Sequence, residues 1–166
     1  MSCTREEALE KLLHHYDEVY RTARRSSETT PLCATAFLHC TGSRKLLSIA
    51  SVGVTESDDF VYLYSTETLD AALLERCVSA AREDALSRID PNPNHEFSLI
   101  SPLFLCDRID SAAMAQIKRT RFRQKDPKPG HGWAELRLAA VETGTGRHAA
   151  NTAGKTLWNV YKTAVR

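Results

Sequence analysis

The sequence has no long hydrophobic run. Charged or strongly polar residues interrupt each of its apolar stretches, whereas a helix that crosses a bilayer needs about 20 consecutive apolar residues. A protein that spans the membrane with helices is therefore excluded. Near the N-terminus, Glu6 and Glu7 stand where a signal peptide would carry basic residues followed by an apolar segment. We therefore expect a cytoplasmic protein that does not bind a membrane.

Motifs that pair metal ligands or activate nucleophiles are also missing. The sequence contains no CxxC pair, no HxxxH or HExxH spacing, and no GxSxG, GxGxxG or phosphate-loop pattern. We therefore expect neither a bound metal nor a cofactor. An odd number of scattered cysteines argues against a disulfide framework and predicts mainly buried thiols, with Cys3 exposed near the terminus. The five are Cys3, Cys33, Cys40, Cys77 and Cys106.

Neither sign of charge is in excess over the whole chain. Lysine and arginine total 22, aspartate and glutamate total 21, and 42% of the 166 residues are hydrophobic, which is typical of one globular domain. The charge is uneven along the chain, however, because residues 118–166 carry a net charge of +8 and residues 1–117 a net charge of −7. This polarity can attract an anionic partner or dock one copy on another, unless folding interleaves the two halves.

The first part of the chain predicts a helix followed by three strands. Residues 5–24 repeat apolar side chains at helical spacing after Thr4, a suitable N-cap. Three runs rich in β-branched and aromatic residues follow, separated by the turn-forming sequences TGSR and TESDD. Short connections join antiparallel neighbours, so we expect a three-stranded meander. Its strands are residues 33–40, 45–54 and 60–66.

The second part predicts helices and strands in alternation. The expected helices are 69–89, capped by Thr66 or Thr68; 111–122, capped by Asp110 or Ser111; and a final one capped by Asn151 or Thr152. The expected strands are 97–106 and 133–142, which form a βαβ unit with the helix between them, and a short hairpin arm after the sequence TGTG.

This order of elements, αβββαβαβ(β)α, predicts an α+β fold. We expect a single domain over residues 1–166. We also expect a mainly antiparallel sheet, with its four helices packed chiefly against one face.

The segment 118–131 is rich in cations and contains a single acidic residue. Cations at this density attract phosphate, and an aromatic ring beside them can stack on a base. The alternative is a solvated helix end, because cations are favoured near a helix C-terminus in any case. The candidate contacts for an anionic ligand or a nucleic acid are Lys118, Arg119, Arg121, Arg123, His131 and Trp133.

Two further charged residues share one face of the expected strand 133–142. Glu135 and Arg137 alternate with apolar residues and lie on the same face as Trp133. They can form a buried pair or the polar floor of a pocket, or they can be the exposed charges of an edge strand. Both interpretations stay open, so both residues join the candidate ligand contacts. An enzyme that acts on a small metabolite or a nucleic acid, with a pocket around His131, Glu135 and Arg137, is the alternative to a binding module.

A metal-dependent nuclease related to restriction endonucleases is a further alternative, because such enzymes share the order αβββαβ. Their third strand carries two carboxylates and a lysine that hold Mg²⁺ and the attacking water. Residues 60–66 contain no acid and no lysine, and Glu67 only follows them. The sequence therefore disfavours this class.

The segment GWAELRLAAVETGTGRHAANTAGKTLWNVYK, residues 132–162, resembles the C-terminal signature of a family of small uncharacterised proteins from anaerobic bacteria. In that family a Gly-Trp pair opens a strand with a LAAV-like run, and a turn then leads to a helix that begins with Asn-x-x-Gly-Lys. Residues 34–64, with FLHCTGSRKLLS and an aromatic strand, are similar to its N-terminal half. The resemblance implies one domain of bacterial origin and transfers no catalytic residue.

From these observations we expect a cytoplasmic binding or regulatory module that self-associates and whose anionic ligand approaches residues 118–131. An enzyme and a structural oligomer without a ligand are the alternatives. Catalysis requires polar groups that converge in a cleft, whereas a docking surface leaves them spread and exposed.

Overall fold

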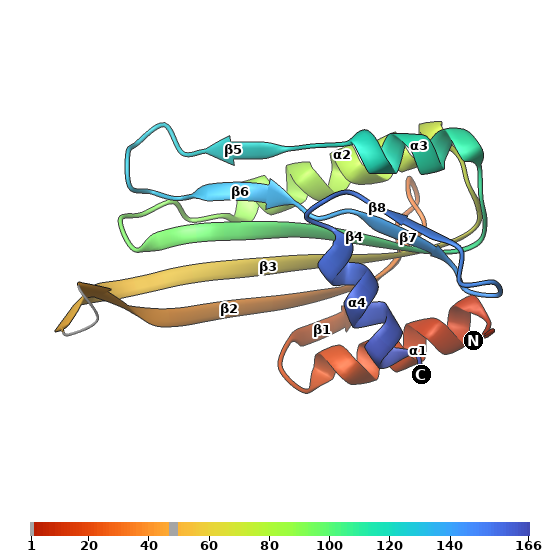
Figure 1. Ribbon diagram of the computed structural model, residues 1–166, viewed down its shortest axis with the longest axis horizontal. Helices are drawn as coiled ribbons and strands as arrows, with labels where there is room; N and C mark the ends of the chain where they lie inside the picture. Colours follow the sequence, from red (N-terminus) through yellow and green to blue (C-terminus); the bar gives the residue numbers. More distant parts are fainter. Residues whose placement is uncertain (1, 47–49) are drawn as a thin grey trace.

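Figure 1 shows a computed structural model that describes residues 2–46 and 50–166. Over these residues the chain forms four helices and one mixed sheet of eight strands, and the expected α+β fold is confirmed. None of the described helices has the length and hydropathy needed to cross a bilayer. The helices are α1 (Arg5–Asp17), α2 (Ala71–Arg88), α3 (Ser111–Arg119) and α4 (Lys155–Ala164). The strands are β1 (Arg21–Arg24), β2 (Leu32–Leu46), β3 (Ala50–Leu69), β4 (His95–Ile109), β5 (Arg123–Lys125), β6 (Trp133–Leu136), β7 (Ala139–Glu142) and β8 (His148–Ala150).

The strand order is β1-β2-β3-β4-β6-β5, and β7 and β8 extend the sheet beside the second half of β4. The pairs β1·β2, β2·β3, β5·β6 and β7·β8 are antiparallel. The pairs β3·β4, β4·β6 and β4·β7 are parallel. The predicted βαβ unit is therefore present, since β6 returns parallel to β4 after α3, and so is the hairpin arm β8.

Two helices cover each face of the sheet, rather than all four packing chiefly against one. α2 and α3 lie on one face, and α1 and α4 on the other. The reason lies in β3, which is apolar on both sides: Tyr62 and Tyr64 pack under α2, whereas Val61 and Leu63 pack under α1 and α4. A strand that is buried on both faces needs cover on both.

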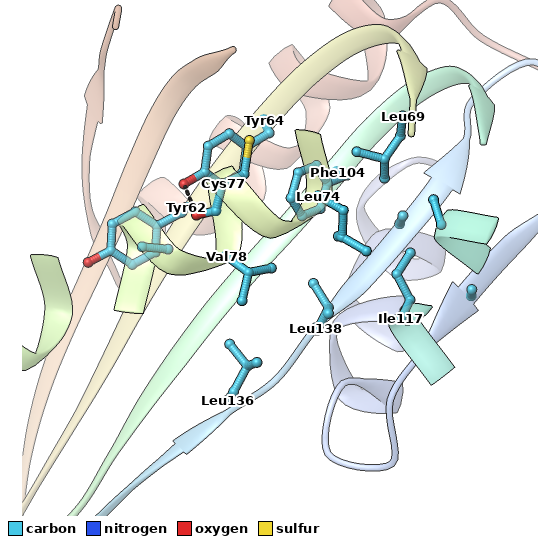
Figure 2. Packing of buried hydrophobic residues seen from close by; sticks show 14 of the residues in the cluster. Tyr62, Tyr64, Leu69, Leu74, Cys77, Val78, Phe104, Ile117, Leu136 and Leu138 are labelled. Atoms are coloured by element: carbon cyan, nitrogen blue, oxygen red, sulfur yellow. Dashed lines mark hydrogen bonds between the residues drawn. The ribbon is translucent and has the colours of Figure 1, made fainter. Parts of the chain in front are cut away.

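The core under α2 and α3 is shown in Figure 2. The ring of Tyr64 stacks on Phe104 with 4.8 Å between ring centroids. Its hydroxyl donates to the carbonyl oxygen of Cys77 in α2 at 3.1 Å. A buried tyrosine is favourable only when its hydroxyl finds such a partner. This contact therefore fixes α2 on the sheet.

The first helix is shorter and the first strands are longer than the sequence predicted. α1 ends at Asp17, and residues expected at its end form β1. β2 and β3 make one long ladder that runs through TGSR and TESDD, which were expected to be turns; for example, Thr41 pairs with Glu56. Pairing between the two strands gives their backbone N–H and C=O groups hydrogen-bond partners, whatever side chains the strands carry. Of the expected strand 45–54, residues 47–49 lie outside the described residues.

The later elements differ from expectation at their ends. Asp70, and not Thr66 or Thr68, caps α2, and its side chain accepts the N–H of Leu73. The expected strand 133–142 is divided into β6 and β7, because the N–H of Leu138 turns to the side chain of Asn151 instead of continuing the ladder.

All five cysteines are free. Cys77 and Cys106 are buried, as predicted, and burial raises the pKa of each thiol to about 12. Cys3 is half-buried rather than exposed, because its N–H donates to the carbonyl oxygen of Thr143 and anchors the N-terminal segment. Cys40 is the exposed thiol.

Candidate functional site

α1 and α4 leave part of their side of the sheet uncovered. In Figure 1 none of the described helices lies in front of β5, β6 and the first half of β4. The side chains that these three strands present on this side are named here the open face. They are Phe97, Leu99, Arg123, Lys125, Trp133 and Glu135.

The register of the strands brings these side chains together. In one row across the sheet Phe97 lies beside Trp133, which lies beside Lys125; in the next row Leu99, Glu135 and Arg123 are neighbours. Residues in the alternate positions of β4 and β6 point to the other face, where they are part of the core under α2 and α3. These are Ile100, Ala134 and Leu136.

An aromatic pair lies at the centre of the open face. The rings of Phe97 and Trp133 have centroids 5.7 Å apart and are tilted by 31°. Both side chains are half-buried, and the guanidinium of Arg123 lies 4.8 Å from the centroid of Trp133. Lys125 is exposed beside the pair. The surface therefore combines flat apolar rings with cations at its margin.

Arg137 lies at the edge of the open face, on the side toward α1 and α4. Its guanidinium donates to Asp59 at 2.6 Å and to Thr156, at the start of α4, at 3.1 Å. The hydroxyls of Tyr20 and Ser101 also donate to Asp59, both at 2.7 Å. Arg137 is held in a nearly buried ion pair, but its partner is Asp59. The pair of Glu135 with Arg137 that the sequence suggested is therefore wrong.

The electrostatics of this polar cluster follow from burial. The side chains of Arg137 and Asp59 are only 17% and 8% exposed. Burial, together with the negative charge of Asp59, raises the pKa of Tyr20 far above its usual value. Tyr20 therefore remains a hydrogen-bond donor to Asp59 at any physiological pH. Arg137, held in this cluster, cannot turn to a ligand without breaking it.

His131 lies on the other side of β6, in the loop between β5 and β6. Its carbonyl oxygen accepts a hydrogen bond from the ring of His95 at 2.7 Å. His131 lines a small pocket of about 150 Å³ together with residues of α2 such as Leu86. Glu135 and Arg137 lie on the opposite side of the sheet. The three polar groups of the enzyme alternative are therefore not brought together.

The basic segment divides into two parts. Lys118 and Arg119 are exposed in the last turn of α3. Arg121 follows them and donates to the backbone carbonyl of Lys118 and to the hydroxyl of Thr152. Arg123 alone of the four predicted cations reaches the aromatic pair.

The comparisons with known proteins identify the family. Residues 4–163 match the model of the family described as Domain of unknown function (DUF8052). The chain belongs to this family. No curated protein and no solved structure matches the chain. The resemblance to an uncharacterised family is therefore confirmed, and the DUF8052 match includes every residue of the open face.

A second polar network of this DUF8052 domain lies near the small pocket. The carboxylate of Asp58 contacts His39 at 2.6 Å and accepts from the hydroxyl of Ser98 at 3.3 Å, and Ser98 is 2.8 Å from the ring of His95. A serine between a histidine and a carboxylate has the composition of a nucleophile and its base. Ser98 is fully buried, however, and no substrate can reach it. In the described part of the chain, no three potential ligands gather to hold a metal.

Four residues of the candidate site were not found in the sequence. Phe97, Leu99 and Lys125 belong to the open face, and Asp59 holds Arg137. The sequence of β4 gave the opposite signal for Phe97, because the polar Ser98 is buried whereas the apolar Phe97 and Leu99 on either side of it are only partly buried. Asp59 gave no signal, since its partner lies 78 positions away.

Proposed function

We propose that the protein is a binding module that holds single-stranded nucleic acid on the open face. The observation that carries the proposal is the arrangement of Phe97 and Trp133 side by side, with Arg123 and Lys125 at their margin. The five free cysteines fit a reducing compartment, so we also propose that the module acts in the cytoplasm.

Single strands are bound by stacking and by charge. Aromatic side chains on a sheet give about 1–3 kcal/mol for each stacked base, whatever the base, because every base has a flat face. Cations beside the rings contact the phosphates. Duplex DNA offers its bases only at their edges, so a flat aromatic surface favours a strand whose bases are free.

The open face supports binding more than catalysis. Its charged groups are spread along the outer strands, and the buried ion pair of Arg137 and Asp59 is satisfied by its own neighbours. A catalytic site needs groups that converge on one reacting atom. We therefore favour the binding module over the enzyme.

Fluorescence anisotropy with a labelled oligothymidine tests the proposal. We expect saturable binding to the wild-type protein. We expect Trp133→Leu to weaken it about tenfold, the loss of one stacked base. Replacing Arg123 and Lys125 together by glutamine should weaken it as well. The matched control replaces Lys118 and Arg119 by glutamine, which removes the same charge from the same segment and leaves the aromatic pair untouched.

Three results would contradict the proposal. The first is an oligonucleotide that does not bind, and the second is an equal loss in the two double variants. The third is a protein that binds no oligonucleotide but forms a dimer in light scattering, where Trp133→Leu converts the dimer to monomers. That last result would assign the open face to self-association.

A further inference from the structure

A pocket of about 470 Å³ lies between α2 and the loop 25–31, and the proposed function does not use it. Tyr62 and Tyr64, which form part of its lining, point to the face of the sheet opposite the open face. The pocket is therefore separate from the proposed nucleic-acid surface. Its volume lies in the range of small-molecule sites, about 300–1,000 Å³.

Small residues on α2 create the space. Ala80 and Ala81 face the pocket where larger side chains would fill it. Leu32 and the nearly buried Tyr62 and Tyr64, each tyrosine at most 3% exposed, line the pocket on the side of the sheet. A ligand that enters between the helix and the loop would thus meet the two alanines and Leu32 as its apolar contacts.

The loop that forms the other wall is held at both ends. The N–H of Arg25 donates to the carbonyl oxygen of Cys33 at 2.9 Å, and the N–H of Ser65 donates to Pro31 at 3.0 Å. Within the loop, the hydroxyl of Ser27 accepts the N–H groups of Thr29 and Thr30, both at 3.3 Å. The wall is therefore formed before a ligand arrives, which lowers the entropy cost of binding.

Two arginines are among the lining residues, Arg25 from the loop and Arg88 from the end of α2. Asp84 is the one carboxylate among the lining residues, so the charged lining has a net charge of +1. Asp84 is already bonded, since the hydroxyl of Tyr62 donates to it at 2.6 Å and Arg88 lies farther away at 3.4 Å. Asp84 thus occupies only one of the N–H donors of the Arg88 guanidinium.

The guanidinium of Arg88 is positioned by aromatic rings, 5.0 Å from the centroid of Phe60 and 5.5 Å from that of Phe37. Arg25 donates through Nε to the hydroxyl of Thr35 at 3.2 Å. A guanidinium carries five N–H donors. Both arginines therefore keep donors for an oxyanion that enters between them.

We propose that this pocket binds a small molecule that carries a carboxylate or phosphate group on an apolar body. The oxyanion lies between Arg25 and Arg88, where a planar guanidinium can donate two parallel hydrogen bonds. The apolar body lies over Tyr62, Tyr64 and Ala80.

Isothermal titration calorimetry with phenyl phosphate, benzoate and inorganic phosphate tests this inference. We expect saturable binding of phenyl phosphate or benzoate. Inorganic phosphate should bind more weakly, because it has no apolar group to bury in the pocket. The tighter of the first two identifies the oxyanion as phosphate or carboxylate. No saturable binding of either in the millimolar range would overturn the proposal. So would inorganic phosphate that binds as tightly as both.

Charge variants locate the site. Arg25→Gln and Arg88→Gln should each weaken binding about tenfold or more, the loss of one charge-assisted hydrogen bond. Arg82→Gln is the matched control, because Arg82 also lies on α2 with its guanidinium 5.0 Å from an aromatic centroid, that of Phe122, and is not part of this pocket. Equal affinities in Arg88→Gln and Arg82→Gln would refute the site.

A third variant fills the pocket without changing charge. Ala80 is exposed on α2, so Ala80→Leu should fold normally, with an unchanged circular dichroism spectrum, and abolish phenyl phosphate binding. Retained binding in this variant would overturn the proposal. Oligothymidine binding should be unchanged in Ala80→Leu and in Arg25→Gln, so that failure at this pocket and failure at the open face are separate results.

Discussion

At the scale of single residues, Asp59 shows how the hydrogen bonds of a nearly buried carboxylate are satisfied by its neighbours. Arg137 and the hydroxyls of Tyr20 and Ser101 all donate to it. Removing the guanidinium would leave a buried charge without its counter-ion, which costs about 3–5 kcal/mol. Because Arg137 keeps some contact with water, we expect Arg137→Ala to lower the free energy of unfolding by about 3 kcal/mol, the low end of that range. Urea denaturation at neutral pH measures it.

The control for this prediction is an ion pair on the surface. Arg108 and Asp110 are 3.1 Å apart with side chains 68% and 35% exposed. Water and salt screen such a pair, so Arg108→Ala should cost less than about 1 kcal/mol. If Arg137→Ala and Arg108→Ala lower the free energy of unfolding equally, the buried ion pair of Arg137 and Asp59 stabilises the fold no more than a surface ion pair does.

At the scale of elements, Asn151 joins the junction of β6 and β7 to the beginning of α4. Its side-chain oxygen accepts the N–H groups of Leu138 and Gly154, and its amide nitrogen donates to the carbonyls of Thr120 and Leu136. Asn151 is 1% exposed and has all four bonds. The Asn-x-x-Gly part of the segment that carries the family resemblance is therefore explained by structure, without a ligand.

Gly154 has no side chain because there is no room for one. A Cβ at this position would lie 2.0 Å from the carbonyl oxygen of Leu138, which is backbone and cannot move aside easily. We expect Gly154→Ala to lower the free energy of unfolding by about 2–3 kcal/mol, as overpacking does. Thermal and urea unfolding measure the change.

Gly144→Ala is the matched control, since nothing lies within 4 Å of the Cβ it would add and its backbone does not require glycine. We expect its stability to stay within about 0.5 kcal/mol of the wild type, as for most surface substitutions. A Gly154→Ala protein as stable as Gly144→Ala would mean that α4 can shift away from β7.

Elements with a strong periodic pattern could be predicted from the sequence. α2, α3 and β4 lie where expected within a few residues, because apolar spacing and capping residues act locally. The long ladder of β2 and β3 could not be predicted, since polar turn-forming sequences are paired across it. Pairing between distant segments overrides local preference when it satisfies the backbone.

The candidate site was predictable only where one strand carries it. The alternation in β6 put Trp133, Glu135 and Arg137 on one side, as the structure has them. Phe97 joins Trp133 from another strand, and Asp59 joins Arg137 across the sheet. Such contacts depend on the parallel register of β4 with its neighbours, which no short segment of sequence encodes.

At the scale of the whole molecule, folding interleaves the acidic and the basic parts of the chain. β6 and β7 come from the basic part, and both pair with β4 of the acidic part. Arg137 of one part neutralises Asp59 of the other. Arg137 is therefore lost from the excess of eight positive charges after residue 117 as a free surface cation. Arg123 and Lys125 remain beside the aromatic pair on the outer strand of the sheet.

This distribution sets the salt dependence of nucleic-acid binding. Each phosphate contact to a single strand contributes about −0.7 to the slope of log affinity against log salt. If Arg123 and Lys125 supply two contacts, we expect a slope of about −1.4, whereas all eleven cations of residues 118–166 acting together would give nearly −8. Anisotropy titrations over a range of sodium chloride concentrations measure the slope. Glutamine at 123 and 125 should bring it near zero, and glutamine at 118 and 119 should leave it unchanged. A steep slope that persists in the first double variant would mean that the strand follows charges elsewhere on the surface, and that stacking on Trp133 is not where it binds.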